Sequence, residues 1–169
     1  MEVTIRLAEI QDAEQIIAHT KTVLSESTFM LTALEEFNVT VEQEEKFIES
    51  HQKPGSLIIV AEVNGVIVGC ANFQTSKKVR LSHLGYFGIS IQEAYCNKGI
   101  GRKLLEYLLE WAKAEPGLEK VCLEVFSHNE RAIHLYKKLG FQEEGRKVNF
   151  VKFSDEHYED EILMYQYVK

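Results

Sequence analysis

The stretch "CNKGIGRKLLEYLLEWA", Cys96–Ala112, places two glycines one residue apart directly before a strongly apolar helical pattern. Glycine inside a helix costs about 1 kcal/mol relative to alanine, so Gly99 and Gly101 do not serve helix propensity. A glycine turn that opens a helix presents free backbone N–H groups at the positive helix end, and together these bind phosphate or pyrophosphate. The flanking residues that can add charge-assisted contacts are Lys98, Arg102 and Lys103. The stretch predicts an anion-binding turn, and the alternative is a tight turn with a solvated basic edge.

The residues around this turn exclude two common nucleotide motifs. A Walker loop requires lysine after its second glycine, but Arg102 follows Gly101. A dinucleotide-binding fingerprint requires a third glycine, and Leu104 stands in its place. The turn therefore belongs to neither motif.

Outward from the turn, strand and helix patterns alternate. The Asn64-Gly65 pair joins two apolar runs into an antiparallel hairpin, because it accepts the dihedral angles of a two-residue turn. Strands are predicted at 3–10, 56–63, 66–74, 79–91 and 120–126, with a closing antiparallel pair near 146–153 and 160–168. Helices are predicted from 12 to 23, after the Thr40 and Gln43 capping box, from 100 to 115 and from 129 to 139. Together these elements predict an α/β protein with a mixed, mostly antiparallel sheet of about six or seven strands and helices on both faces.

Composition limits the class of protein. A chain of 169 residues with 45% hydrophobic and 27% charged residues fits one domain, residues 1–169. Its net charge of −7 argues against a nucleic-acid binder, which must neutralise phosphates. The first ten residues lack the pattern of a signal peptide, and no run approaches the roughly 20 apolar residues of a membrane span. We therefore expect a cytoplasmic protein that binds neither nucleic acid nor a membrane.

Cysteine and histidine spacing predicts no metal site. The three cysteines are widely spaced, which leaves neither a disulfide framework nor a C-x-x-C motif. The six histidines include no H-x-x-x-H or H-E-x-x-H pair. We therefore expect no metal cofactor.

Two motifs at the right separation carry a family resemblance. The segment "ISIQEAYCNKGIGRKLLEYLLEWA", followed by "LEVFSHNERAIHLYKKLGF", resembles the GNAT superfamily of N-acetyltransferases, which bind acetyl-coenzyme A (acetyl-CoA) through a [QR]-x-x-G-x-[GA] turn. The resemblance implies the single-domain GNAT fold. It also implies that the backbone of Ile89, Ser90 and Ile91 pairs with the pantetheine arm. The pyrophosphate would then lie on Asn97, Lys98, Gly99, Ile100, Gly101, Arg102 and Lys103.

The sequence departs from the family pattern at one position and matches one branch in its tail. Cys96 stands where the family most often has Gln or Arg. The ending from Gly140 onward, with Asp160 and Met164, is similar to that of the ribosomal-protein alanine and spermidine acetyltransferase-like branch. That branch covers protein N-termini, polyamines, amino acids and antibiotics, so the acceptor stays open.

Acetyl transfer from a thioester to an amine needs a base for the amine proton and an acid for the departing thiolate. Glu124, in mid-strand, is the first candidate base, and the alternative is a sheet carboxylate paired with a cation; His83 is the reserve. On periodicity alone Tyr136 is a core aromatic residue, but the resemblance assigns it the role of general acid. Asn129 is an N-cap, a pantetheine ligand, or both.

The sequence thus predicts an N-acetyltransferase that passes acetyl from acetyl-CoA directly to a primary amine in a ternary complex. A covalent acetyl-enzyme on Cys96 is the less favoured route. The rival functions are a non-catalytic acyl-CoA-binding or sensing module with the same fold, and an interaction protein that merely keeps the fold. The expected partners are acetyl-CoA and an amine acceptor, with a homodimer as an option for assembly. The segments 25–38 and 149–159 are expected to be substrate loops.

Overall fold

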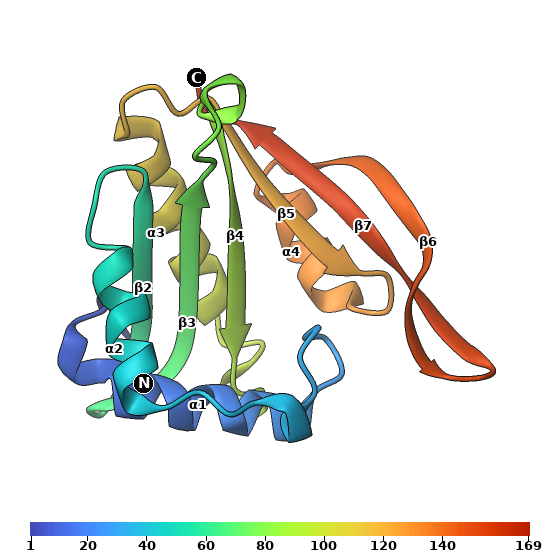
Figure 1. Ribbon diagram of the computed structural model, residues 1–169, viewed down its shortest axis with the longest axis horizontal. Coiled ribbons are helices and arrows are strands. Elements are labelled where there is room, and N and C mark those ends of the chain that lie inside the picture. The colour runs from blue at the N-terminus through green and yellow to red at the C-terminus, as the bar shows by residue number, and fades with distance from the viewer.

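The computed structural model describes residues 1–169 and contains one mixed sheet with four α-helices (Figure 1). The strands are β1 (Thr4–Leu7), β2 (Ser56–Val63), β3 (Val66–Thr75), β4 (Leu84–Ile91), β5 (Lys120–Phe126), β6 (Gln142–Ser154) and β7 (His157–Tyr167). The helices are α1 (Ala13–Glu26), α2 (Val41–Ser50), α3 (Ile100–Ala114) and α4 (Glu130–Lys138). Short 3₁₀ helices are η1 (Ile10–Asp12), η2 (Leu34–Glu36), η3 (Val79–Leu81) and η4 (Glu93–Tyr95).

The seven strands follow the order β1-β2-β3-β4-β5-β7-β6. Every neighbouring pair is antiparallel except β4 and β5, which are parallel and pair at only three positions, ending at Tyr86 opposite Cys122. Beyond that point the two strands diverge, as Figure 1 shows. The half of β4 that includes Ile89–Ile91 therefore has a strand partner, β3, on one side only.

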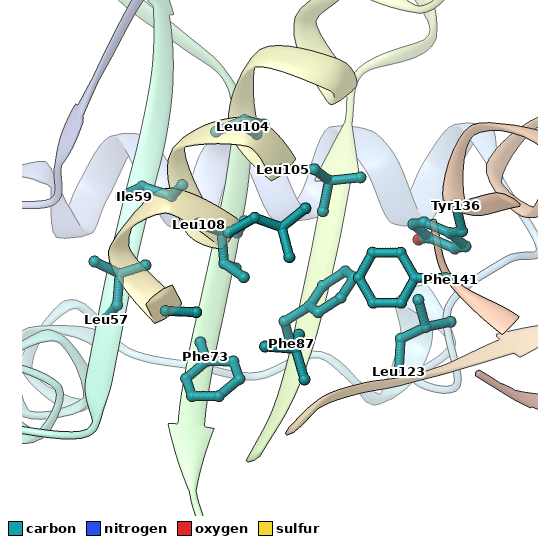
Figure 2. Packing of buried hydrophobic residues seen from close by; sticks show 14 of the residues in the cluster. Leu57, Ile59, Phe73, Phe87, Leu104, Leu105, Leu108, Leu123, Tyr136 and Phe141 are labelled. Carbon is teal, nitrogen blue, oxygen red and sulfur yellow. The ribbon is translucent and has the colours of Figure 1, made fainter. Parts of the chain in front are cut away.

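Helices cover both faces of the sheet, as the sequence predicts. The larger core joins α3 and α4 to one face, and Figure 2 shows the α3 leucines above β2, β3 and β4, with Tyr136 beside Phe87 and Phe141. The smaller core joins α1 and α2 to the other face through residues such as Ile16 and Ile48. Both faces of β2 and most of β3 are consequently buried, whereas Tyr86 on β4 and Glu124 on β5 stay exposed.

Local sequence signals explain several of these elements. Asn64 and Gly65 have φ values of 50° and 79°, as the two-residue hairpin turn requires. The capping box before α2 is formed in both directions, because Gln43 N donates to Thr40 Oγ1 at 3.2 Å and Thr40 N donates to Gln43 Oε1 at 2.9 Å. These predictions are confirmed.

Three predicted boundaries are wrong. The strand expected over 3–10 ends at Leu7, and residues 10–12 form η1 instead. The strand expected from 79 begins only at Leu84, after the 3₁₀ turn η3. The expected loop at 149–159 is mostly strand, since β6 continues to Ser154 and β7 starts at His157. β6 is exposed along almost its whole length, so it lacks the apolar alternation that marks a half-buried strand.

Candidate active site

The turn before α3 has the backbone of an anion site. Asn97 and Gly99 have φ values of 58° and 81°. The first helical hydrogen bond runs from Lys103 N to Gly99 O, and the N–H groups of residues 100–102 have no backbone acceptor. No side chain caps the helix either. The turn therefore presents unpaired donors at the positive end of a 15-residue helix.

Glycine is required at positions 99 and 101 for different physical reasons. A Cβ on Gly99 would meet nothing within 4 Å, so Gly99 is required for its positive φ. A Cβ on Gly101 would lie 3.1 Å from Ile91 Cδ1 and 3.2 Å from Leu135 Cδ2. Gly101 is thus required because α3 packs closely against β4 and α4.

Two of the basic side chains expected to bind the anion make other contacts. Arg102 Nε donates to Glu106 Oε1 at 2.7 Å, and Lys98 Nζ lies 5.5 Å from the centre of the Tyr95 ring. Arg102 lines the cleft described next, whereas Lys98, Ile100 and Lys103 do not. The backbone donors are therefore the main anion-binding feature of the turn.

A cleft of about 410 Å³ starts at this turn and follows the diverging end of β4. Four parts of the chain form its walls: the end of β4, the turn before α3, one side of α4, and the end of α1 with the segment after it. The predicted site residues that line it are Ile89, Ser90, Ile91, Asn97, Gly99, Gly101, Arg102, Asn129 and Tyr136. The volume lies within the range of small-molecule sites.

A buried histidine supports Ser90 from behind. His19 on α1 is 1% exposed, its Nε2 lies 2.9 Å from Ser90 Oγ, and its Nδ1 lies 3.3 Å from Gln92 Nε2. Gln92 Nε2 also donates to the Ile67 carbonyl, so it is the amide side that faces His19 Nδ1. His19 Nε2–H then donates to Ser90 Oγ and leaves the Ser90 proton for another acceptor. Burial lowers the pKa of His19 to about 4.

The Cys96 thiol contacts backbone carbonyls at the end of β4. Its thiol lies 3.8 Å from Ile91 O and 3.6 Å from Gln92 O, and burial raises its pKa. A protonated thiol that is directed at carbonyls is a poor nucleophile. These contacts argue against a covalent acetyl-enzyme on Cys96.

The start of α4 and Tyr136 form the opposite wall. Asn129 Oδ1 accepts from Ala132 N at 3.3 Å, which confirms its N-cap role. The Tyr136 ring packs edge-on against Phe87 and Phe141, and the residue is 6% exposed. Its hydroxyl, which points away from α4 in Figure 2, makes no hydrogen bond within the chain, and burial raises its pKa. Tyr136 is thus both a core aromatic and a protonated phenol at the cleft.

An ion pair between Arg131 and Glu93 forms part of the cleft wall. Arg131 on α4 donates to both Glu93 oxygens, at 3.2 and 3.0 Å, and lowers the pKa of Glu93. Glu93 N in turn donates to Glu26 Oε2 at 2.9 Å. These contacts tie α4 to the segment before α3 and to the end of α1.

The two candidate bases lie outside the cleft. Glu124 is exposed and faces the side of the sheet opposite Tyr136, because its neighbours Leu123 and Val125 pack into the core that contains Tyr136. It nevertheless borders the β4–β5 gap, two residues beyond the last paired position. His83 lies in the turn before β4, at the strand end away from Ile89–Ile91. The structure therefore does not bring His83 to the cleft.

Sequence reasoning missed His19 and the Glu93–Arg131 pair. His19 had a readable signal, since it lies three residues after Ile16 and four before Val23 on the buried face of α1. Glu93 and Arg131 are 38 residues apart, and nothing local marks them as partners.

Comparisons with known proteins agree with this geometry. Residues 25–141 match the model of the acetyltransferase (GNAT) family. The chain is 32% identical over 93 residues to the L-amino acid N-acetyltransferase AaaT of Escherichia coli K12, covering 55% of this chain and 57% of that protein. It is 33% identical over 120 residues to the [ribosomal protein bS18]-alanine N-acetyltransferase of the same strain, covering 71% of this chain and 77% of that protein.

Solved structures share the fold. A GNAT-family acetyltransferase from Streptococcus pneumoniae superposes with a TM-score of 0.94 at 32% identity, covering 99% of this chain and 100% of that one. The structure of yncA from Salmonella typhimurium with its cofactor acetyl-CoA gives 0.88 at 24% identity, covering 100% and 95%. None of the helices in this chain combines the length and apolar character needed to cross a membrane. No three metal-ligating side chains cluster.

Proposed function

This chain belongs to the acetyltransferase (GNAT) family, and from that premise we propose that it transfers an acetyl group from acetyl-CoA to a primary amine. The observation that carries the proposal is the cleft itself. The cleft contains both the unpaired backbone N–H groups before α3 and the end of β4 that does not pair with β5. An amide-rich anion site and an open strand edge in one cleft suit a ligand with a pyrophosphate and an amide-bearing arm.

Acetyl-CoA fits the residues present. The turn from Asn97 to Lys103 would hold the pyrophosphate with backbone N–H groups, and its αL glycine leaves open space there. The backbone of Ile89, Ser90 and Ile91 would pair with the pantetheine amides, and Asn129 would contact the same arm. When bound, acetyl-CoA supplies the activated thioester.

The proposed acid, Tyr136, and the proposed base, Glu124, lie on opposite faces of the sheet near the gap between β4 and β5. Tyr136 lies on the face of the sheet that α3 and α4 cover. Its raised pKa keeps the phenol protonated, so the phenol can give its proton to the departing thiolate. Glu124 borders the gap on the other face, where an ammonium acceptor can approach from solvent. Glu124 takes the ammonium proton, and the freed amine attacks the thioester directly.

The names of the similar proteins suggest the class of acetyl acceptor. They are named for an amino acid and for a protein N-terminal alanine, and we propose acceptors of these two classes first. We further propose that residues 1–169 work as one acetyltransferase domain. All three cysteines are free thiols, which suits a reducing compartment, and the cytoplasm is our choice.

We propose a homodimer through β6. This strand is the last of the sheet, and its Val148 and Phe150 are 72% and 44% exposed. Analytical ultracentrifugation should give twice the 19.4 kDa chain mass. A monomer at micromolar concentration would contradict this assembly.

The test of the function combines affinity with turnover. Calorimetry should detect acetyl-CoA binding, and a thiol-release assay with polyamines, amino acids, aminoglycosides and ribosomal N-terminal peptides should detect turnover with at least one class. Binding without release across the panel would favour the non-catalytic acyl-CoA-binding module. Absence of binding would reject both.

A further inference from the structure

A second carboxylate lies beside Glu124 on the acceptor side of the sheet. Glu124 pairs with Leu163 across β5 and β7, and Glu161 stands two residues before Leu163, so both carboxylates are on one face. Glu124 is exposed, but Glu161 is only 5% exposed. A buried carboxylate beside another carboxylate is costly unless a group of the chain compensates it.

Lys147 on β6 compensates the charge of Glu161 but not its hydrogen-bonding capacity. Lys147 pairs in register with Glu161, and its Nζ lies 3.0 Å from Glu161 Oε2 while it covers the Phe150 ring at 4.6 Å. The ion pair lacks hydrogen-bond alignment, because the buried Glu161 Oε2 has no hydrogen-bond partner. A carboxylate has about four lone-pair positions, so Glu161 keeps acceptor capacity beside Glu124 after its contact with Lys147.

Titratable side chains from each neighbouring strand lie on the same side of the sheet as Glu124. They are Tyr86 on β4, Cys122 on β5 itself, Glu161 on β7 and Lys147 on β6. Burial raises the pKa of Glu124, the negative Glu161 raises it further, and Lys147 lowers it. The two carboxyl groups are within hydrogen-bonding reach, so a protonated Glu124 can donate to Glu161.

We propose that Glu161 is a positioning residue for acetyl transfer, whose buried carboxylate accepts a hydrogen bond from Glu124 once Glu124 has taken the acceptor's proton, while Lys147 holds the Glu161 side chain in place. The proposal rests on Glu124 being the base of the proposed function. The proton moves from the ammonium nitrogen to Glu124, which leaves the nitrogen lone pair free to attack. Because Glu124 is exposed, it can then return the proton to solvent.

The first test is a ¹³C carboxyl NMR titration of the full-length protein, with Glu124 assigned through Glu124→Gln. In Glu161→Gln the pKa of Glu124 should lie about one pH unit lower, since the like charge is lost. Glu161→Asp keeps the charge and should largely restore the wild-type titration. Lys147→Met should move the first protonation of the pair to higher pH, whichever carboxyl takes the proton.

A matched control comes from the same hairpin. Glu143 on β6 is paired with Met164, which faces the main core, so Glu143→Gln removes a carboxylate on the other face. It should leave the titration of Glu124 unchanged. An unmoved Glu124 in Glu161→Gln, or an equal shift in the control, would overturn the proposal.

The second test uses the acceptor found by thiol release and follows kcat/KM against pH. The acid limb should disappear in Glu124→Gln and move about one pH unit lower in Glu161→Gln. If the limb persists in Glu124→Gln, Glu124 is not the base, and both the base assignment and the role of Glu161 fall. If the limb is lost there but unmoved in Glu161→Gln, only the role of Glu161 falls.

Discussion

Tyr136 combines a ring in the main core with a hydroxyl that has no partner in the chain, so Tyr136→Phe separates packing from chemistry. Turnover should fall by roughly a hundredfold or more, because general acid catalysis contributes on that order. Acetyl-CoA affinity should be unchanged, since proton donation matters only as the carbon–sulfur bond breaks. Stopped-flow turnover and calorimetry on one preparation provide both numbers.

Tyr107→Phe is the matched control for this change. Tyr107 lies on α3, is 37% exposed and is absent from the cleft. It should leave turnover intact. Near-normal turnover in Tyr136→Phe would remove that hydroxyl from the mechanism.

His19 predicts a pH dependence of stability. Its folded pKa of about 4 lies below the unfolded value of 6.5, so the unfolded chain binds more protons between these values and stability falls as pH drops from 6.5 to 4. The difference corresponds to about 3 kcal/mol in the free energy of unfolding. Urea unfolding at pH 7 and pH 4.5 should therefore show a smaller loss in His19→Gln than in the wild type.

The exposed His157 serves as the comparison for His19. His157 pairs with Glu159 on the β7 hairpin and is not buried. His157→Gln should keep most of the wild-type acid sensitivity. Equal curves for wild type and His19→Gln would show that His19 is not held neutral.

At the scale of elements, the start of α3 can be tested with two glycines of the same geometry. Gly99 and Gly117 have φ values of 81° and 78°, and a Cβ on either meets nothing within 4 Å. Aspartate at either position should cost about 1–2 kcal/mol of backbone strain. Only Gly99→Asp also places a negative charge in the cleft, so it alone should weaken acetyl-CoA binding at least tenfold by calorimetry. Equal affinities would reject the pyrophosphate site.

Elements with local signals were predictable, and those with distant causes were not. The Asn64-Gly65 hairpin and the turn before α3 follow from dihedral preferences that neighbouring residues impose. Glu161 is placed beside Glu124 by the β5–β7 register, and the Ser90 contact of His19 crosses 71 residues. Strand alternation also puts Glu124 and Tyr136 on opposite faces of the sheet, which the separate motifs of the sequence did not reveal.

At the scale of the whole molecule, two half-sheets meet at a parallel seam of three paired positions, while α3 and α4 cover one side of the junction. Bound acetyl-CoA would bridge the halves, so hydrogen exchange at residues 89–91 should slow strongly on binding. Residues 59–62, which pair on both sides, serve as the internal reference. Equal protection changes in both segments would indicate general stabilisation instead of contact at β4.

The divergence of β4 and β5 also bears on how the protein behaves when acetyl-CoA is scarce. A strand edge without a partner is a template on which other chains can add, and here such an edge, the end of β4 that faces β5, lies in the middle of the sheet. A ligand that occupies it acts as a surrogate strand and blocks that recruitment. We therefore expect the protein without acetyl-CoA to aggregate more readily than the protein that has acetyl-CoA bound.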